Sequence, residues 1–464
     1  MTTEGFSTRS PIDGSEVVAR AFTTPEETKK ALERAVRAQK KWKLTPVRER
    51  VALVTKAVDA FVKKRDVLAE EITRQMGRPI SQSPGEVRGF EERARYMASI
   101  AEEALADVGV GEKEGFTRFV RREPLGVVLA IAPWNYPFLT AVNSVVPAIL
   151  AGNTVLLRHS PQTPLAAERI VEAFREAGAP DGVVAFLHTT DEDTDKLVEA
   201  DGVDFVAFTG SVRVGHLIQR HAVGRFIPVG LELGGKDGAY VRADANLSHA
   251  IENLVDGAFF NSGQSCCGIE RIYVDASVYE RFVDGFVELT KQYRLGNPLD
   301  PSVNLGPLVR ASAAEFVRGQ IAEAVAAGAQ ALVDAKTFAA DARGTPYLAP
   351  QVLTRVNHSM RVMREETFGP AVGIMKVSGD EEAVELINDS PYGLTAAIWT
   401  SDEDAATRIG ARLEVGTVFQ NRCDYLDPAL AWTGVKDSGR GCTLSRLGYE
   451  SLTRPKSFHL RTRT

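Results

Sequence analysis

Short apolar runs alternate with longer, helix-like segments through most of the chain. The runs GVVLAIA, from Gly126, and TVLLR, from Thr154, are rich in branched side chains and almost free of polar positions, as in strands buried on both faces. Similar runs begin at Val183, Asp204 and Phe226. Strands and helices that alternate in this way predict a parallel sheet covered on both faces.

The helix expected after TVLLR is marked at both of its ends. Thr163 stands at the N-cap position, Pro164 at the first helical position, and Gly178 just past the end. A helix bounded so clearly supports the strand–helix rhythm around it.

A second series of elements follows Leu233 and predicts a second α/β domain. We place the first domain at residues 1–105 and 125–233 and the second at 234–437. In the second we expect helices near 246–262, 278–292 and 311–327, and strands near 270, 371, 394 and 416.

Two basic, extended stretches stand outside this rhythm: FTRFVRREP, at 116–124, and the tail from Ser457. They could be a frayed loop and terminus, or a β-ribbon used for subunit association. The sequence leaves both open for the segments 106–124 and 453–464.

Composition narrows the possible partners. The net charge of −6 is spread without a basic stripe, so we expect neither a nucleic-acid nor a membrane partner. The first residues lack a signal peptide's charged start and apolar core, which favours a cytoplasmic protein. The four cysteines show no CxxC spacing, so we expect no metal site.

Four segments could carry chemistry, although each has an ordinary structural explanation when taken alone. Asn135 follows a strand in IAPWNYPF and could simply form a turn. Glu232 in LELGGKDG could cap a helix or form a salt bridge. The adjacent Cys266 and Cys267 in NSGQSCCG could be packing residues. The turn FTGSVRVG could bind phosphate at a helix N-terminus but lacks the GxGxxG pattern.

Together, these segments resemble the NAD(P)-dependent aldehyde dehydrogenase superfamily, and the likeness covers nearly the whole chain. Further matches, in the family's order and spacing, are AGNTVLLRHSPQTP, EETFGPAV, SPYGLTAAIWT, GTVFQN and VKDSGRG. The resemblance implies an α/β fold with a Rossmann-type cofactor domain (1–105 and 125–233), an α/β catalytic domain (234–437) and a small β oligomerisation ribbon. It also implies a homodimer, with a homotetramer as the alternative.

The resemblance implies covalent oxidation of an aldehyde to the carboxylic acid. The family pattern F-x-N-x-G-Q-x-C places the nucleophile at Cys266. The Asn135 amide and the Cys266 N–H would hold the oxyanion, and Glu232 would activate the water that hydrolyses the thioester. Alternatives are a coenzyme A-acylating or acyl-reducing member of the same fold, and a protein that binds without turnover.

Cofactor residues carry over in the same way, and one departure bears on cofactor choice. The family's Lys in K-P-x-E is Arg158 here, and its Glu, which repels a 2′-phosphate, is Pro161. We therefore expect both NAD and NADP to be used. The positions that match cofactor-binding residues are Trp134, Arg158, Ser160, Gly210, Ser211, Gly215, Leu233, Glu366 and Phe368.

A second departure concerns the general base. Many members carry a Lys and a Glu that relay protons behind it, and the matching positions are Ser144 and Thr443. Both charges are missing together, so no unpaired buried charge is left. We expect Glu232 to release its proton through water instead.

A third departure concerns the substrate. The usual PFGG segment is AWTG, so Trp432 is the expected pocket aromatic. Members that oxidise succinic semialdehyde often carry an Arg on the helix after the catalytic Asn, and here that position is Asn143, which argues against this substrate. The matching pocket positions are Tyr136, Leu139, Asn143, Ser265, Cys267, Leu426 and Trp432.

Overall fold

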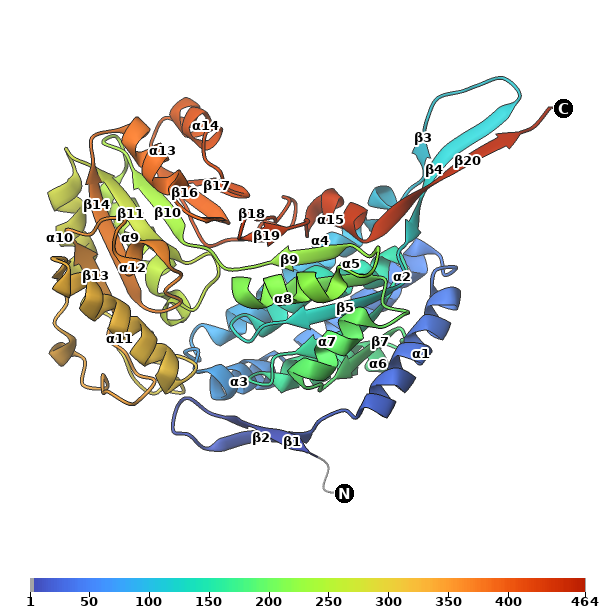
Figure 1. The fold of residues 1–464 in the computed structure, drawn as a ribbon, viewed down its shortest axis with the longest axis horizontal. Helices are drawn as coiled ribbons and strands as arrows, with labels where there is room; N and C mark the ends of the chain where they lie inside the picture. The colour runs from blue at the N-terminus through green and yellow to red at the C-terminus, as the bar shows by residue number, and fades with distance from the viewer. Residues whose placement is uncertain (1–3, 464) are drawn as a thin grey trace.

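A computed structural model describes residues 4–463 as two α/β lobes with a β-ribbon that projects from one of them (Figure 1). The chain starts with a hairpin and four helices. Their bounds are β1 (Gly5–Arg9), β2 (Glu16–Ala21), α1 (Pro25–Trp42), α2 (Val47–Val62), α3 (Arg65–Met76) and α4 (Ser83–Ala104).

The first lobe is built on a six-stranded sheet in the order β19-β9-β8-β5-β6-β7. All neighbours are parallel except β19, which is antiparallel to β9. From β5 the chain first adds strands on one side of the sheet and then, from β8, on the other. Open α/β sheets bind ligands at such a switch point, beyond the carboxyl ends of the strands. The strands are β5 (Val127–Ala132), β6 (Thr154–His159), β7 (Val184–Leu187), β8 (Phe205–Thr209), β9 (Val229–Glu232) and β19 (Gly439–Arg440).

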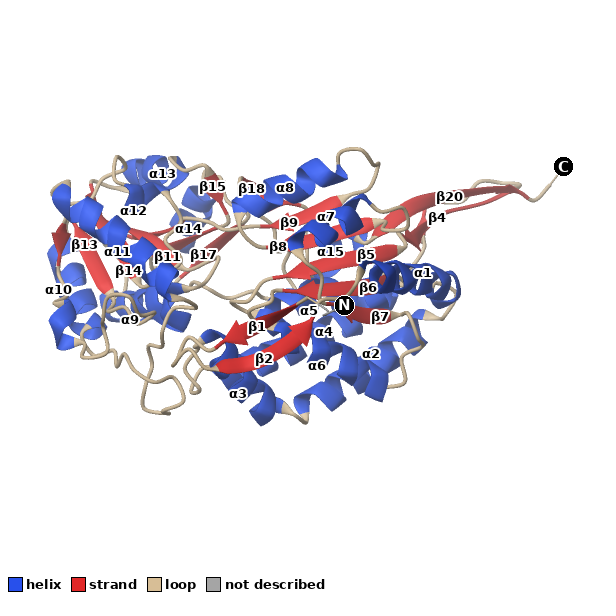
Figure 2. Cartoon of the chain, turned by 60° about the horizontal axis from the view of Figure 1, so that its bottom comes forward, coloured by secondary structure: helices blue, strands red, loops and turns tan. Residues whose placement is uncertain are grey.

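Helices cover both faces of this sheet, as Figure 2 shows. Val128 and Ala130 point into a core with α2, α4, α5 (Pro137–Ala151) and α6 (Pro164–Glu176). Val127 and Leu129 point the other way, toward α1, α7 (Asp191–Glu199) and α8 (Val212–Ala222). Because successive side chains alternate across a strand, an uninterrupted apolar run fills two cores at once.

The five strands predicted for this sheet are present, with two local differences. The run from Phe226 pairs only from Val229, because Pro228 has no N–H to donate; Phe226 itself is fully exposed. Thr163 is the N-cap of α6, but its hydroxyl lies 3.2 Å from His159 Nδ1 instead of bonding a helix N–H.

The second lobe holds a seven-stranded sheet in the order β12-β13-β14-β11-β10-β16-β17, parallel except for β12. Its strands are β10 (Asp237–Val241), β11 (Ile269–Asp275), β12 (Gln330–Ala331), β13 (Gln351–Thr354), β14 (Ala371–Val377), β16 (Thr395–Trp399) and β17 (Thr417–Gln420). Its helices are α9 (Leu247–Phe259), η1 (Phe260–Gly263), α10 (Tyr279–Thr290), α11 (Ala311–Ala326), η2 (Ala335–Thr337), α12 (Arg361–Arg364), α13 (Asp380–Asn388) and α14 (Glu403–Gly410).

The two basic stretches pair with each other. Strand β4 (Phe116–Pro124) runs antiparallel to β20 (Thr453–Arg461), and the short β3 (Val108–Gly109) lies on the other side of β4. Phe119 stacks on Phe458 with ring centroids 4.5 Å apart. Of the two possibilities left open, the structure has the ribbon. The remaining elements are β15 (Tyr392–Gly393), β18 (Val435–Lys436) and α15 (Ser445–Ser451).

Within residues 4–463, every helix is too short or too polar to span a bilayer.

Candidate active site

Loops from both lobes meet at the carboxyl ends of the first sheet and enclose a chamber of about 360 Å³. Asn135 follows β5, Glu232 ends β9, and Cys266 lies in the loop before β11. All seven predicted pocket residues line this chamber together with Cys266 and Glu232: Tyr136, Leu139, Asn143, Ser265, Cys267, Leu426 and Trp432.

A left-handed turn delivers Cys266 to the chamber. Asn261, Ser262 and Gly263 have φ values of 52°, 58° and 72°, which is costly for the first two residues. A Cβ on Gly263 would lie 2.4 Å from the Gly369 carbonyl oxygen, so only glycine fits there. Buried hydrogen bonds hold the turn, including one of 2.8 Å from the Ser262 hydroxyl to the Gly306 carbonyl.

The two adjacent cysteines face different surroundings. Cys266 is half-buried at the chamber, whereas Cys267 is buried and its Sγ donates a hydrogen bond of 2.9 Å to Asp424 Oδ1. The hydrogen bond with Cys266, together with burial, raises the pKa of Cys267 well above that of a free thiol. Burial raises the pKa of Asp424 to about 6. Cys267 is therefore held as a thiol.

Asn135 places an amide beside the cysteine loop. Its side chain is 4% exposed, and Nδ2 donates to the Gln264 carbonyl oxygen at 3.2 Å. Among residues 4–463, no protein acceptor takes the Cys266 backbone N–H. The Asn135 amide and this N–H are therefore two donors on neighbouring segments.

A buried ion pair that we did not predict fixes the Asn135 segment. The Arg78 guanidinium is paired with the Glu86 carboxylate, and both side chains are almost fully buried. Arg78 also donates to the Asn135 carbonyl, and its Nε donates to Asn261 Oδ1 at 3.2 Å. Glu86 Oε1 accepts the backbone N–H of Phe138 at 2.9 Å, at the start of α5. One pair therefore joins the start of α5 to the turn before Cys266.

The sequence contains a pattern that could have pointed to Glu86, and also to Arg93. Glu86 and Arg93 lie on α4 at helical spacing with the core residues Phe90 and Met97, so the apolar face of α4 carries two charges. Buried charges need partners, which marks that face as more than packing.

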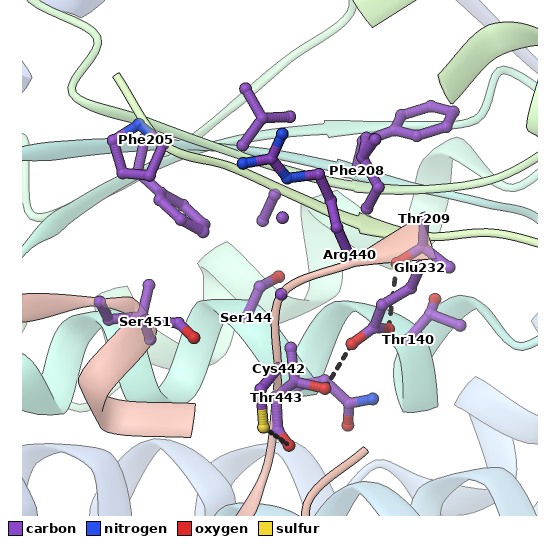
Figure 3. A pocket seen from close by; sticks show the side chains of 18 residues that line it. Thr140, Ser144, Phe205, Phe208, Thr209, Glu232, Arg440, Cys442, Thr443 and Ser451 are labelled. Carbon is purple, nitrogen blue, oxygen red and sulfur yellow. Dashed lines mark hydrogen bonds between the residues drawn. The ribbon is translucent and has the colours of Figure 1, made fainter. Parts of the chain in front are cut away.

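Glu232 lines both the chamber and a second cavity, and Figure 3 shows it among the residues that line the second one. Its Oε1 accepts a hydrogen bond from the Thr443 hydroxyl, and its Oε2 lies 3.4 Å from the Thr209 hydroxyl. Burial raises the pKa of Glu232, while Thr443 and the nearby charge of Arg93 oppose that rise. The carboxyl group can therefore exchange a proton closer to neutral pH than a free Glu.

The second cavity, of about 190 Å³, lies behind Glu232. Ser144 and Thr443, the positions where many relatives carry the charged relay, both line it. The wall between this rear cavity and the chamber is shared by Thr140, Asn143, Thr209 and Glu232.

The residues predicted for the adenine and phosphate side lie around the start of α8. The Ser211 hydroxyl accepts the Val214 N–H at 3.4 Å as the N-cap, and the Gly210 N–H donates to the Glu232 carbonyl at 3.1 Å. A Cβ on Gly215 would lie 2.7 Å from Leu233, so glycine brings this helix close to the β9 loop. The free N–H groups of the first turn suit the phosphates of a dinucleotide.

Glu366 and Phe368 are set by a second buried ion pair. Lys236 Nζ lies 2.5 Å from Glu270, and Glu270 accepts the N–H groups of Thr367 and Phe368 at 2.9 to 3.0 Å. Glu366 accepts the Gly235 N–H at 3.2 Å, and burial raises its pKa to about 8.

The two aromatic cofactor positions come together: the Phe368 and Trp134 rings meet edge to face, 5.7 Å apart. This polar and aromatic donor set fits a nicotinamide and its ribose.

Arg158 and Ser160 lie at the end of β6. Arg158 is mostly buried and pairs at 2.5 Å with Asp191, whose side chain is 95% exposed. Its Nε is buried and has no protein partner. The Ser160 hydroxyl accepts the Gln162 N–H at 3.2 Å. A buried donor of this kind fits a ribose or phosphate oxygen.

In the part of the chain from residue 4 to 463, no group of three or more His, Cys, Asp or Glu residues is placed to hold a metal ion.

Comparison with known proteins identifies the family. A family model described as the aldehyde dehydrogenase family matches residues 1–458. Succinate semialdehyde dehydrogenase [NAD(P)+] Sad of Escherichia coli is 33% identical over 95% of this chain and 94% of its own length.

Two further relatives differ in the substrates that their names give. Betaine aldehyde dehydrogenase of Bacillus subtilis is 30% identical over 98% of this chain and 94% of its own length. The solved NADP-dependent glyceraldehyde-3-phosphate dehydrogenase of Bacillus halodurans C-125, complexed with NADP, is 35% identical, with a TM-score of 0.93 over 100% of this chain and 97% of its own. The chain therefore belongs to the aldehyde dehydrogenase family.

Proposed function

We propose that the protein oxidises an aldehyde to its carboxylic acid with NAD or NADP, through a thioester on Cys266. The observation that carries this proposal is that Cys266 and Glu232 line one chamber while the Asn135 amide lies against the cysteine loop at Gln264. Within residues 4–463 the Cys266 N–H has no protein acceptor. Family membership supports it, because relatives are named as NAD(P)-dependent dehydrogenases.

The first half of the reaction forms the thioester. The Cys266 thiolate attacks the aldehyde carbon, and the carbonyl oxygen becomes an oxyanion that accepts from Asn135 Nδ2 and the Cys266 N–H. A bound dinucleotide would supply the acceptor for the hydride of this carbon, and the carbonyl double bond would then reform. Glu366 and Phe368 would hold the nicotinamide end, and Trp134, whose ring lies against Phe368, would hold the pyrophosphate.

The second half releases the acid. Glu232 takes a proton from a water molecule, the oxygen attacks the thioester carbon, and the carbon–sulfur bond breaks to return Cys266. The rear cavity behind Glu232 offers water a place to carry the proton away, where Thr443 and Ser144 replace a charged relay. The raised pKa of Glu232 suits this exchange.

The proposal that both NAD and NADP are used depends on the residues at the end of β6. Pro161 offers no carboxylate to repel a 2′-phosphate, and the only carboxylate paired with Arg158 in the described chain is the exposed Asp191. Arg158 would contact the 2′-phosphate of NADP. A catalytic efficiency with NADP below about one per cent of that with NAD would contradict dual use.

We assign the first lobe to cofactor binding and the second to the nucleophile, with boundaries at 1–105 and 125–233, 234–437, and 106–124 with 453–464. We also propose assembly through the β4–β20 ribbon, as a homodimer or a homotetramer.

An aldehyde panel tests the proposed function. The full-length protein is incubated with each aldehyde and NAD or NADP, with and without coenzyme A, while absorbance of the reduced cofactor is followed. We expect turnover without coenzyme A, its loss in Cys266→Ala, and most of it kept in Cys267→Ala. Turnover that requires coenzyme A, or activity that follows Cys267 instead, would refute the assignment.

A further inference from the structure

Arg93 places a guanidinium on the chamber wall without a carboxylate partner. The residue is 8% exposed and extends from α4 toward the start of α5. No salt bridge within residues 4–463 includes it. A buried, unpaired cation is costly, so its presence needs an explanation.

The hydrogen bonds of Arg93 leave one edge of its guanidinium free. Nη1 donates to the Leu139 carbonyl at 2.7 Å and to Asn143 Oδ1 at 3.2 Å. Nε and Nη2 have no protein acceptor among the described residues, and neither is among the side-chain atoms sealed from open space. These two N–H groups form a planar fork that fits a carboxylate with two parallel hydrogen bonds.

The other charged groups buried in the chamber wall have protein partners, whereas Arg88, which also lines the chamber, is exposed to solvent. Glu86 is paired with Arg78, and Asp424 accepts from Ser265 and Cys267. Toward the entrance, Glu92 accepts the Tyr425 hydroxyl at 2.7 Å. Among residues 4–463, Arg93 is therefore the buried cation of the chamber wall that lacks a carboxylate partner, and a substrate anion would not compete with a protein carboxylate for its free edge.

We propose that Arg93 binds the carboxylate of an aldehyde substrate that carries an anionic tail, such as a semialdehyde. This inference rests on the proposed function, and it specifies the class of aldehyde that the protein would oxidise. Asn143 occupies the position where relatives that oxidise succinic semialdehyde often carry an Arg. Arg93, on the neighbouring helix α4, hydrogen-bonds to Asn143 and so brings a guanidinium to the same part of the chamber. Burial lowers the pKa of Arg93, but an arginine remains protonated at neutral pH.

The test compares acidic and neutral aldehydes of equal length: succinic and glutaric semialdehyde against butanal and pentanal. In Arg93→Met we expect kcat/KM for the semialdehydes to fall about 100-fold, mainly through KM, while the neutral aldehydes change less than about threefold. Arg93→Lys should recover part of the loss, because it keeps the charge without the fork. The control Arg95→Met removes an exposed arginine of the same helix and should change neither class.

Equal losses for both classes in Arg93→Met, or a wild-type preference for the neutral aldehydes, would overturn the inference. Calorimetric binding of succinate and butyrate gives a readout without turnover. Wild type should bind succinate at least about tenfold more tightly than butyrate, and Arg93→Met or Arg93→Lys should reduce that advantage. If wild type binds succinate more tightly than butyrate but oxidises no aldehyde, the proposed function fails and the anion site stands. If wild type shows no preference for succinate, or if the preference survives in both variants, the anion site is refuted.

Discussion

At the scale of single residues, the active-site loop separates two neighbouring thiols by their partners. Cys266 faces the chamber, and Cys267 donates to Asp424 inside the wall. Asp424 has a φ of 50°, so the backbone is held in a left-handed conformation to bring its carboxyl group to the thiol. The surroundings, not the chemistry of cysteine, make the two residues different.

Asp424 gives a prediction of how stability varies with pH. Its pKa of about 6 in the folded state exceeds the usual 3.8, so the folded protein keeps a proton that the unfolded chain releases. The stability that this proton provides is complete below pH 4 and is lost as pH rises through 6, by at most roughly 3 kcal/mol. Asp424→Asn should therefore gain stability relative to wild type between pH 4 and 7. Unfolding in urea at four pH values measures this.

The matched control is Asp427→Asn, which changes an exposed aspartate of the same loop. It should track wild type across the pH range. A constant difference between Asp424→Asn and wild type would show that Asp424 does not titrate in this range.

At the scale of elements, the active site depends on how α4 meets α5. The Arg78–Glu86 pair satisfies the free N–H groups at the start of α5 and the carbonyl of Asn135, and it reaches the turn at Asn261. A helix N-terminus leaves backbone donors unpaired, and Glu86 supplies the acceptor that a local capping side chain would otherwise give. Tyr136 in the N-cap position has no such side-chain bond.

Glu86→Gln tests this junction. It keeps the size and one acceptor but leaves the Arg78 charge buried without a partner, so we expect roughly 3 to 5 kcal/mol of destabilisation. Aldehyde oxidation should fall as well, because the Arg78 guanidinium that holds the Asn135 carbonyl loses its carboxylate partner. Thermal unfolding and steady-state kinetics measure the two effects.

Glu91→Gln serves as the comparison, because Glu91 forms an exposed pair with Arg95 on the same helix. It should cost less than about 1 kcal/mol. If both variants lose the same small amount, the buried pair does not hold the junction.

At the scale of the whole molecule, the β4–β20 ribbon extends away from the compact body (Figure 1). Val110 and Leu460 on this arm are 47% and 49% exposed. Exposed apolar side chains on a projecting β-structure favour contact with another chain. This is the physical basis for assembly through the ribbon.

Charging the ribbon should weaken that assembly. In the double variant Val110→Asp and Leu460→Asp, we expect the dissociation constant of the oligomer to rise at least about tenfold. Sedimentation over a range of concentrations reports the mass. Val325→Asp, on α11 of the other lobe, is the control and should not alter it. An unchanged mass in the double variant would place the subunit contact elsewhere.

The sequence by itself determined the features that depend on neighbouring residues. Strands at Val127 and Thr154 follow from local apolar runs, and Gly263 and Cys266 belong to one short motif. Local patterns such as these depend on backbone preference and side-chain period, which a chain carries before it folds.

Only the tertiary structure decided which distant groups meet. Arg78 and Asn261 are 183 residues apart in the chain yet hydrogen-bonded. In the same way, Arg93 became a chamber residue only when α4 packed against α5, and Ser144 and Thr443, far apart in the chain, line the same cavity behind Glu232. Burial and pairing of charges depend on the whole fold, because the free energy of a charge is set by the groups that surround it, not by its neighbours along the chain.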